Sequence, residues 1–408
     1  MKKLFFIASF ITGTISTSLG QGFQVNLQGQ KQQAMGSAAC ALPQDAAAIF
    51  YNPGSVSFLS ANSVIAGVST TISRSAFQDA ISNTVSRTQS PVGTPFTFYA
   101  AFSAKDSSRL KLGMGIYTPF GSGIKWEDGW TGRFALTSIK LLSIFFQPTL
   151  SYKINDKWGI GAGAIYANGA VTLKKDIPVI NQNGEYGKAE LNGKANGYGF
   201  NAGIYFAATK KISLGLSYRS QVNMEVKNGS ASFDVPTSLA ANFPNGSFTS
   251  SLPLPSVTTL GASFNANEKW SVTSDINYVG WSAYKALEFD YELNTSSLKD
   301  TKSERNYENT FAFRLGTQFK KDEKLTLRSG LSYVITPVQD GYVTPETPDA
   351  TRLNVACGFS YIISKKLCAD ISFTYQRLKR TDTNLETKLS GTFKTFVYIP
   401  GASLQYNF

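Results

Sequence analysis

The residue types that most often carry out chemistry are either missing from this chain or placed without a catalytic pattern. The sequence of 408 residues contains no histidine, which excludes Ser-His-Asp catalysis, histidine-based metal sites and axial histidine ligation of haem. Its three cysteines, Cys40, Cys357 and Cys368, are not spaced as metal ligands, and their odd number leaves at least one without a partner in the same chain. We therefore expect no enzyme, no metal and no cofactor, and we interpret the cysteines as small packed residues.

Arginines interrupt rows of apolar residues at Arg219, Arg314 and Arg352. In "TFAFRLGTQF" the phenylalanines and the leucine fall on one face of an extended chain, and Arg314 falls on the other. In "ISLGLSYRSQVNMEV" (212–226) the same alternation continues for fifteen residues, longer than most strands of soluble proteins. An arginine in contact with lipid is costly near the bilayer centre, so these arginines are predicted to face a lumen.

Composition favours a transmembrane β-barrel over a set of soluble domains. Charged residues make up only 16%, and glycine (35) and phenylalanine (29) are frequent, without any linker or shift in composition. After the first twenty residues, no apolar run is long enough for a membrane-spanning helix. The net charge of +12 is concentrated in turns, so we assign it to contact with lipid phosphates and expect no nucleic-acid binding.

The N-terminus has the pattern of a secretory signal peptide over residues 1–20. Lys2 and Lys3 form a basic start, residues 4–11 form a short apolar core, and Ser18-Leu19-Gly20 places small residues before a cut at Gln21. No cysteine follows the cut, which argues against a lipoprotein anchor. We expect export to the bacterial outer membrane.

Short, lysine-rich turns recur along the chain, as in "KINDKW" (153–158), "AATKKI" (207–212) and "NANEKW" (265–270). Longer polar stretches lie between them, and short turns at one rim with long loops at the other are typical of outer-membrane barrels. The breaks predict an all-β, antiparallel barrel of about 14 strands. We expect these strands to begin near Asn62, Pro95, Arg109, Ile139, Lys157, Gly187, Lys211, Pro255, Lys269, Tyr307, Lys324, Asp349, Lys366 and Phe393.

The last strand alternates up to a terminal phenylalanine, Phe408. Such an end is typically recognised by the outer-membrane assembly machinery. The apolar residues occupy odd positions before Pro400-Gly401 and even positions after it. We interpret this change of parity as a β-bulge at Pro400-Gly401.

Residues 21–61 precede the first long strand, and the barrel is expected over 62–408. The stretch "DAAAIFYNPGSVSFL" (45–59) reads as a short apolar helix stopped by Asn52-Pro53-Gly54. The segment is too short for an independent domain and too apolar to be solvated. Because a barrel of about 14 strands has an interior wider than its own side chains fill, we interpret residues 21–61 as a plug.

The run "GFQVN…MGSA…QDAAAIFYNPG" resembles the N-terminal hatch of the FadL-type long-chain fatty-acid transporters of bacterial outer membranes. That motif usually ends in Asn-Pro-Ala, whereas this chain has Gly54. Two further stretches, 117–134 and 270–287, and the terminal phenylalanine are also similar to the family. The matching hatch positions are Gly22, Phe23, Asn26, Gly36, Ala38, Asp45, Ala46, Asn52 and Pro53.

The resemblance implies a barrel blocked by a hatch that passes fatty acids or similar hydrophobic molecules passively to a lateral opening in the wall. The family places this opening at a kink in the third strand, here "RLKLGMGIYTPFG" (109–121). Gly113 and Gly115, on the lumen face, are the candidate lateral gate, with a close fit of the hatch as the alternative. Phe23 matches a family residue beside the ligand pocket, with a plain hatch core residue as the alternative. Arg314 is the candidate partner of a ligand carboxylate, with pairing to Asp or Glu as the alternative.

Two other functions stay open at this stage. One is a general porin for small polar solutes, and the other is a surface interaction protein that uses long loops such as "NFPNGSFTSSLPLP" (242–255). The expected partners are hydrophobic small molecules, outer-membrane lipids with lipopolysaccharide, and the assembly machinery through Phe408. A closed barrel needs no partner strand, so we expect a monomer.

Overall fold

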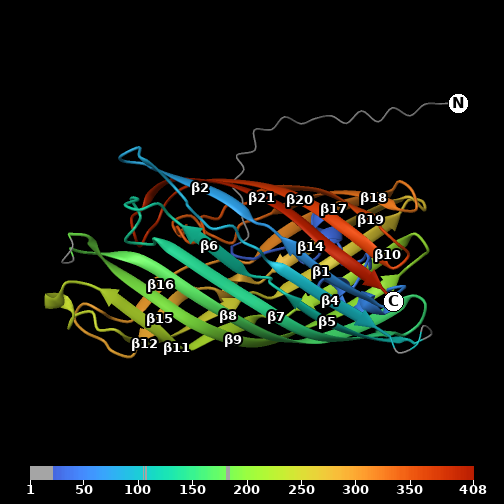
Figure 1. The fold of residues 1–408 in the computed structure, drawn as a ribbon, viewed down its shortest axis with the longest axis horizontal. Helices are drawn as coiled ribbons and strands as arrows, with labels where there is room; N and C mark the ends of the chain where they lie inside the picture. Colours follow the sequence, from blue (N-terminus) through green and yellow to red (C-terminus); the bar gives the residue numbers. More distant parts are fainter. Residues whose placement is uncertain (1–21, 104, 106–107, 181–183) are drawn as a thin grey trace.

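A computed structural model describes residues 22–103, 105, 108–180 and 184–408. The signal peptide expected over 1–20 lies outside the described residues. Among those residues, no helix has the length and apolar character needed to cross a membrane. The chain forms a closed antiparallel barrel of 14 strands, several of which are interrupted once (Figure 1).

Seven of the 14 barrel strands are unbroken: β7 (Ser138–Lys153), β8 (Trp158–Ile180), β9 (Tyr186–Ala207), β18 (Leu325–Val334), β19 (Arg352–Ile362), β20 (Leu367–Thr383) and β21 (Ser390–Asn407). The other seven each consist of two consecutive segments: β1 (Ser63–Ser69) and β2 (Ile72–Asp79), β3 (Val85–Arg87) and β4 (Phe96–Phe102), β5 (Leu110–Tyr117) and β6 (Gly121–Lys125), β10 (Ile212–Arg219) and β11 (Val222–Asp234), β12 (Gly246–Leu254) and β13 (Val257–Asn265), β14 (Trp270–Val279) and β15 (Ala286–Tyr291), and β16 (Thr301–Glu304) and β17 (Thr310–Lys320). The barrel closes where β1 pairs with β21, from Ser63 opposite Asn407 to Ser69 opposite Gly401. The predicted fold class and strand number are confirmed.

Side chains alternate between lipid and lumen along each strand because successive residues point to opposite faces. In β17, Phe313 and Leu315 are about half exposed on the outside, whereas Arg314 between them is buried inside the barrel. The lumen placement predicted for Arg314 therefore holds, and Arg219 and Arg352 are buried in the same way.

The two rims differ as the turn lengths predict. The short turns and the C-terminus lie at one rim, and the long loops lie at the other (Figure 1). By the pattern of outer-membrane barrels, the rim with short turns faces the periplasm and the rim with long loops faces outward. The 3₁₀ turn η2 (Thr237–Leu239) lies in the long loop between β11 and β12, and η3 (Trp281–Ala283) lies at the interruption between β14 and β15.

The β-bulge expected at Pro400-Gly401 is absent. β20 pairs Phe373 with Pro400 and Ser372 with Gly401 in unbroken register. Odd-numbered residues face the lumen along the whole of β21, but Phe393 in the outward half is apolar and Gln405 in the periplasmic half is polar. The apolar residues change parity because the lumen changes polarity along its axis, so this expectation was wrong.

A break occurs instead within 212–226, where the sequence predicted a single uninterrupted strand. Tyr218 of β10 is exposed on the outside, yet Val222 of β11, four residues later, is buried in the lumen. The pairing with β9 shifts by one residue between Arg219, opposite Asn201, and Glu225, opposite Asn196. The extra residue turns the apolar row of β11 from the lipid side to the lumen, which corrects the prediction.

Residues 22–61 are largely buried and contact several strands of the barrel wall, and we refer to them as the hatch. It contains α1 (Gln30–Ala34), α2 (Ala48–Tyr51) and the 3₁₀ helix η1 (Pro53–Phe58). α1 packs against β18 to β21, and η1 packs against β5 and β7 to β10, so the hatch reaches the wall on several sides. All three cysteines are free: Cys40 and Cys368 are buried, and Cys357 is exposed on the outer face.

Candidate functional site

The broken helix of the hatch is held by one asparagine. The side chain of Asn52 donates from Nδ2 to the carbonyl oxygens of Cys40 (2.9 Å) and Ile204 (3.0 Å), which joins two parts of the hatch to the wall. Its Oδ1 accepts from the backbone N–H of Gly54 (3.0 Å) and caps η1, and Pro53 at the first helical position has no N–H to satisfy. The residues of the Asn-Pro-Gly motif thus end α2, start η1 and fix both to the barrel.

Glycine at position 54 is required by a close approach of two backbones. A Cβ atom there would lie 2.5 Å from the carbonyl oxygen of Gly203 and 3.0 Å from that of Gly159. On the wall side, a Cβ atom at Gly161 would lie 2.3 Å from the carbonyl oxygen of Pro53. Four glycines therefore let η1 lie directly on β8 and β9.

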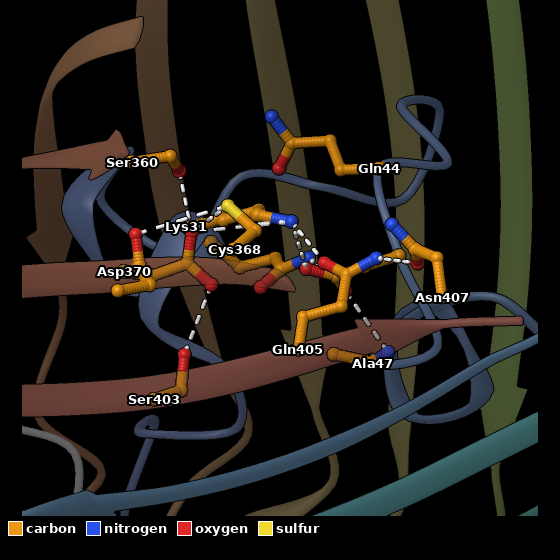
Figure 2. Close-up of polar contacts among 12 residues, drawn as sticks. Lys31, Gln44, Ala47, Ser360, Cys368, Asp370, Ser403, Gln405 and Asn407 are labelled. Atoms are coloured by element: carbon orange, nitrogen blue, oxygen red, sulfur yellow. Dashed lines mark hydrogen bonds and ion pairs between the residues drawn. The ribbon is translucent and has the colours of Figure 1, made fainter. Parts of the chain in front are cut away.

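A buried ionic network holds the other side of the hatch (Figure 2). The ammonium of Lys31, in α1, lies 3.3 Å from Asp45 of the hatch and 3.9 Å from Asp370 of β20, and it donates to Gln405 of β21. Asp370 also accepts from the hydroxyl of Ser403 at 3.0 Å. All of these side chains are buried, so the network joins two hatch segments to two wall strands.

The charge state of Lys31 is stable over a wide pH range. Burial lowers the pKa of its ammonium, but Asp45 and Asp370 outweigh burial and raise that pKa above the ordinary value. A raised pKa in the folded state means that the attraction is fully present below the ordinary lysine value and is lost only as the pH rises through the raised one. Lys31 therefore stays charged throughout the physiological pH range, and its ion pairs with Asp45 and Asp370 persist there.

An apolar pocket occupies the outward half of the lumen. It contains about 870 Å³ of space not filled by atoms, part of which is open to solvent. The inner faces of β7, β8, β9, β11 and β12 form its sides, and residues of 284–289 and 346–347 complete it. Leu141, Val171 and Met224 are typical of its lining. The apolar character of this lining suits a hydrophobic small molecule.

Phe23 of the hatch lines this pocket and lies among aromatic rings. Its ring centroid is 5.0 Å from that of Trp281, 5.8 Å from that of Tyr284 and 6.0 Å from that of Phe120. Phe23 therefore lies beside the pocket, as the first interpretation expects. It also packs within the hatch core, as the alternative expects, and the two interpretations are compatible.

The loop 335–351 folds inward over the pocket. Arg305 forms a buried ion pair with Glu346 (2.6 Å), and Trp126 donates from Nε1 to the carbonyl oxygen of Pro345 (3.3 Å). Asp349 of the same loop accepts from the backbone N–H of Gly22 (2.6 Å), the first described residue of the hatch. The roof of the pocket and the start of the hatch are therefore connected directly.

The third barrel strand is interrupted between β5 and β6, at Thr118, Pro119 and Phe120. The hatch occupies the interruption: Val25 donates its N–H to the carbonyl oxygen of Pro119 (2.8 Å), and Gly121 donates to that of Phe23 (3.1 Å). β4 pairs with β5, and the named pairing of β6 is with β7. In the described part of the wall, residues 90–95 and 119–124 have no β-ladder between them, so the ladder has a gap next to the pocket.

Gly113 and Gly115 lie in a part of the wall without such a gap. Both belong to β5, where β4 pairs residue by residue from Thr97 to Phe102. A Cβ atom at Gly113 would lie 2.6 Å from Cδ1 of Ile49 in the hatch, and one at Gly115 would lie 3.2 Å from its Cγ2. These contacts support the alternative that the two glycines fit the hatch against the wall.

Arg314 does not line the apolar pocket. Its Nε donates to Oδ1 of Asn277 (2.6 Å) and its Nη1 donates to the carbonyl oxygen of Gly36 in the hatch (3.2 Å). It lies opposite Asp275 in the pairing of β14 with β17. Phe23 and Arg314 are thus not brought together, and the contacts of Arg314 attach the hatch to the wall.

The sequence reasoning missed most residues of the pocket. Met224 was read only as part of the alternating row 212–226, and Leu141 and Val171 were not singled out. The available signal was that apolar residues occur on both faces at the outward ends of the strands, as in "SIKLLSIFF" (138–146). That signal indicates an apolar lumen at this level of the barrel.

A closed 14-stranded barrel with an internal hatch and an apolar pocket defines a transport protein of the bacterial outer membrane. The chain belongs to the family described as outer membrane protein transport protein (OMPP1/FadL/TodX), whose profile matches residues 11–408. The resemblance stated from the hatch motif is therefore confirmed, as is the outer-membrane location.

Individual relatives are distant. A long-chain fatty acid transport protein of Salmonella typhi is 25% identical over 67% of this chain and 68% of its own. A putative outer membrane protein of Neisseria meningitidis is 25% identical over 95% and 94%. Among solved structures, a Pseudomonas aeruginosa FadL homologue gives a TM-score of 0.80 at 18% identity, covering 95% of this chain and all of that one. The Pseudomonas putida toluene transporter TodX gives 0.74 at 18% identity, over 93% and 98%.

Proposed function

We propose that this protein carries hydrophobic small molecules passively across the outer membrane and releases them sideways into the bilayer. The observation that carries the proposal is that one hatch residue, Phe23, lines the apolar pocket and also bonds to the wall at the gap in the third strand. A molecule in the pocket is thus separated from the gap by the hatch segment 23–25. We move the candidate lateral gate from Gly113 and Gly115 to this gap.

The transport step needs no energy source. A hydrocarbon chain gains about 0.8 kcal/mol for each CH₂ that leaves water, so it moves readily from one apolar site to another. Polar lipopolysaccharide at the outer surface is its main barrier, and the pocket bypasses that barrier. Movement of 23–25 away from the wall would then open a path from the pocket to the membrane. Transport, not catalysis, is the function we infer.

The proposal also covers the molecules that the barrel contacts. We infer that lipopolysaccharide and other lipids surround the exposed apolar belt, and that Phe408 at the periplasmic rim serves recognition by the assembly machinery. The pairing of β1 with β21 leaves no free edge strand. A closed edge supports a monomer.

Filling the pocket should stop transport. Ala195 of β9 is buried and lines the pocket, so Ala195→Trp should weaken ligand binding at least about tenfold by occupying the site. The matched control is Ala164→Trp, because Ala164 on the neighbouring β8 is exposed on the lipid side. The measurement is uptake of labelled hexadecanol and palmitate by cells with and without the protein. Equal uptake by Ala195→Trp and Ala164→Trp would remove the pocket from the transport path.

A further inference from the structure

The charge inside the apolar pocket bears on which molecules it can hold. Among the described side chains that line it, one is charged, and that one is the anion Glu346. Its carboxylate is 2.6 Å from Nη2 of Arg305, and both side chains are nearly buried, with 12% and 6% of their surface exposed. Arg305 lies behind Glu346 and does not line the pocket. The one charged residue of the described lining is therefore already neutralised by a cation that lies outside the lining.

Three serine hydroxyls among the groups that line the pocket already donate to backbone carbonyl oxygens. The hydroxyl of Ser143 donates to the carbonyl oxygen of Phe120 (2.7 Å), and that of Ser250 donates to the carbonyl oxygen of Glu288 (2.6 Å). The hydroxyl of Ser122 donates to the carbonyl oxygen of Glu346 (3.4 Å), and that of Thr347 pairs with Tyr307 (3.1 Å). A hydroxyl has one proton to give, so the three serines have none left for a ligand carboxylate. Thr347 and Tyr284, which is bonded to Arg305, carry the other hydroxyl groups of the described lining.

The three lumen arginines predicted from the sequence are bonded elsewhere. Arg219 donates from Nη2 to the carbonyl oxygen of Phe50 at 2.8 Å, and Arg352 pairs with Asp349 at 3.5 Å. Together with Arg314, they line two other cavities beside hatch residues Gln24 and Asn26. A carboxylate in the apolar pocket would not reach the arginines of these two cavities unless the hatch moved.

We propose that the apolar pocket selects uncharged hydrophobic molecules, such as long-chain alcohols and hydrocarbons, over the carboxylates of the same chain length. This inference rests on the proposed transport function and narrows its ligand class. A carboxylate in the pocket loses its water, gains no cation from the described side chains that line it and lies near Glu346. An uncharged head group loses far less and can accept or donate a single hydrogen bond.

The test compares two ligands that differ only in the head group. Binding of labelled hexadecanol and palmitate to the purified full-length barrel is measured at about pH 9, where a carboxyl group is ionised. We expect hexadecanol to bind at least about a hundredfold more tightly, because a buried charge without a partner is costly. Equal affinity for the two ligands would overturn the inference and leave the transport function standing. Absence of binding by both would instead overturn the transport function.

A single substitution should reverse the selection. Glu346→Gln removes the anion and leaves Arg305 as an uncompensated cation behind the lining, so palmitate binding should rise at least about tenfold relative to the unchanged protein. The control is Glu304→Gln, which makes the same charge change next to Arg305 in the chain, on a side chain that is exposed. Binding of hexadecanol by both variants shows that they are folded. If Glu346→Gln binds hexadecanol but gains no palmitate affinity, the ion pair does not set the selection and the inference fails.

Discussion

Replacing Gly54 with valine should expel the hatch from its seat and turn the closed barrel into an open channel. The carbonyl oxygen of Gly203 lies 2.5 Å from the position of the new Cβ, and that of Gly159 lies 3.0 Å away. Both are backbone atoms of β8 and β9, so no side chain can rotate to make room. Overpacking of this kind typically costs about 1–3 kcal/mol, and a contact with backbone on two strands belongs at the upper end.

The measurement is ion conductance of the purified protein in planar bilayers. The unchanged protein should conduct little, and Gly54→Val should conduct like a porin because the hatch no longer fills the lumen. Gly246→Val is the matched control, since a Cβ atom there meets only the side chain of Leu293 at an ordinary contact distance of 3.7 Å. A closed Gly54→Val barrel with full uptake would show that the hatch does not depend on this close approach.

Replacing Lys31 with methionine should also release the hatch, from the opposite side. The substitution keeps most of the side-chain volume but leaves the two buried carboxylates of Asp45 and Asp370 with Arg328 as their nearby cation, one positive charge too few. Removing one partner from a buried ion pair costs about 3–5 kcal/mol. We expect α1 to leave the wall at β20 and β21, with a lower thermal midpoint and faster proteolysis within residues 22–61.

A double substitution separates charge from packing. Asp370→Asn alone leaves excess positive charge, because Arg328 and Lys31 both remain near the site. The combination of Lys31→Met with Asp370→Asn restores neutrality, so its loss of stability should be smaller than the sum of the two single losses. Additive losses, measured as thermal midpoints in the same detergent, would mean that the charges do not interact across the hatch and wall.

The outer face of the barrel could be predicted from the sequence because every strand needs apolar side chains where it contacts lipid. Apolar residues at alternate positions, as at Phe313 and Leu315, mark that face without knowledge of the rest of the fold. The strand starts could be predicted for a related reason: short polar turns interrupt each alternating row, and β5, β14 and β20 begin within one residue of the expected positions.

The lumen could not be predicted in the same way because its polarity changes along the barrel axis. Its periplasmic half is polar around the hatch and its outward half is apolar around the pocket. The change of apolar parity at Pro400-Gly401 therefore suggested a bulge where β21 is regular, and continuous alternation over 212–226 hid the break between Tyr218 and Val222. Long-range contacts decided both cases, and alternation within one strand does not report them.

The hatch was the part of the site that the sequence revealed most clearly. Asn52, Pro53 and Gly54 form a local stop signal whose capping hydrogen bond involves neighbouring residues. The pocket, in contrast, is assembled from residues of many strands, and its ion pair joins Arg305 to Glu346 from separate loops. Such pairs have no local signature, so the ligand class could be argued only from the three-dimensional arrangement.

The central claim is that hatch segment 23–25 must leave the gap in the third strand for transport to occur. Gln24 and Phe120 form an isolated antiparallel bridge, and the hydrogen bonds on either side of them identify a non-hydrogen-bonded pair. The Cα atoms of such a pair are about 4.5 Å apart, within the range that a disulfide bridges. Gln24→Cys with Phe120→Cys should therefore form a reversible lock between the hatch and the wall.

The decisive measurement is uptake of labelled hexadecanol by cells carrying this double variant, with the exposed Cys357 replaced by alanine, before and after reduction. Each single cysteine variant, oxidised and reduced, serves as the control for the loss of Gln24 or Phe120. We predict that uptake stops in the oxidised double variant and returns on reduction, while the single variants respond to neither treatment. Equal uptake with the disulfide formed would contradict the account, because the ligand would then reach the membrane without moving the hatch.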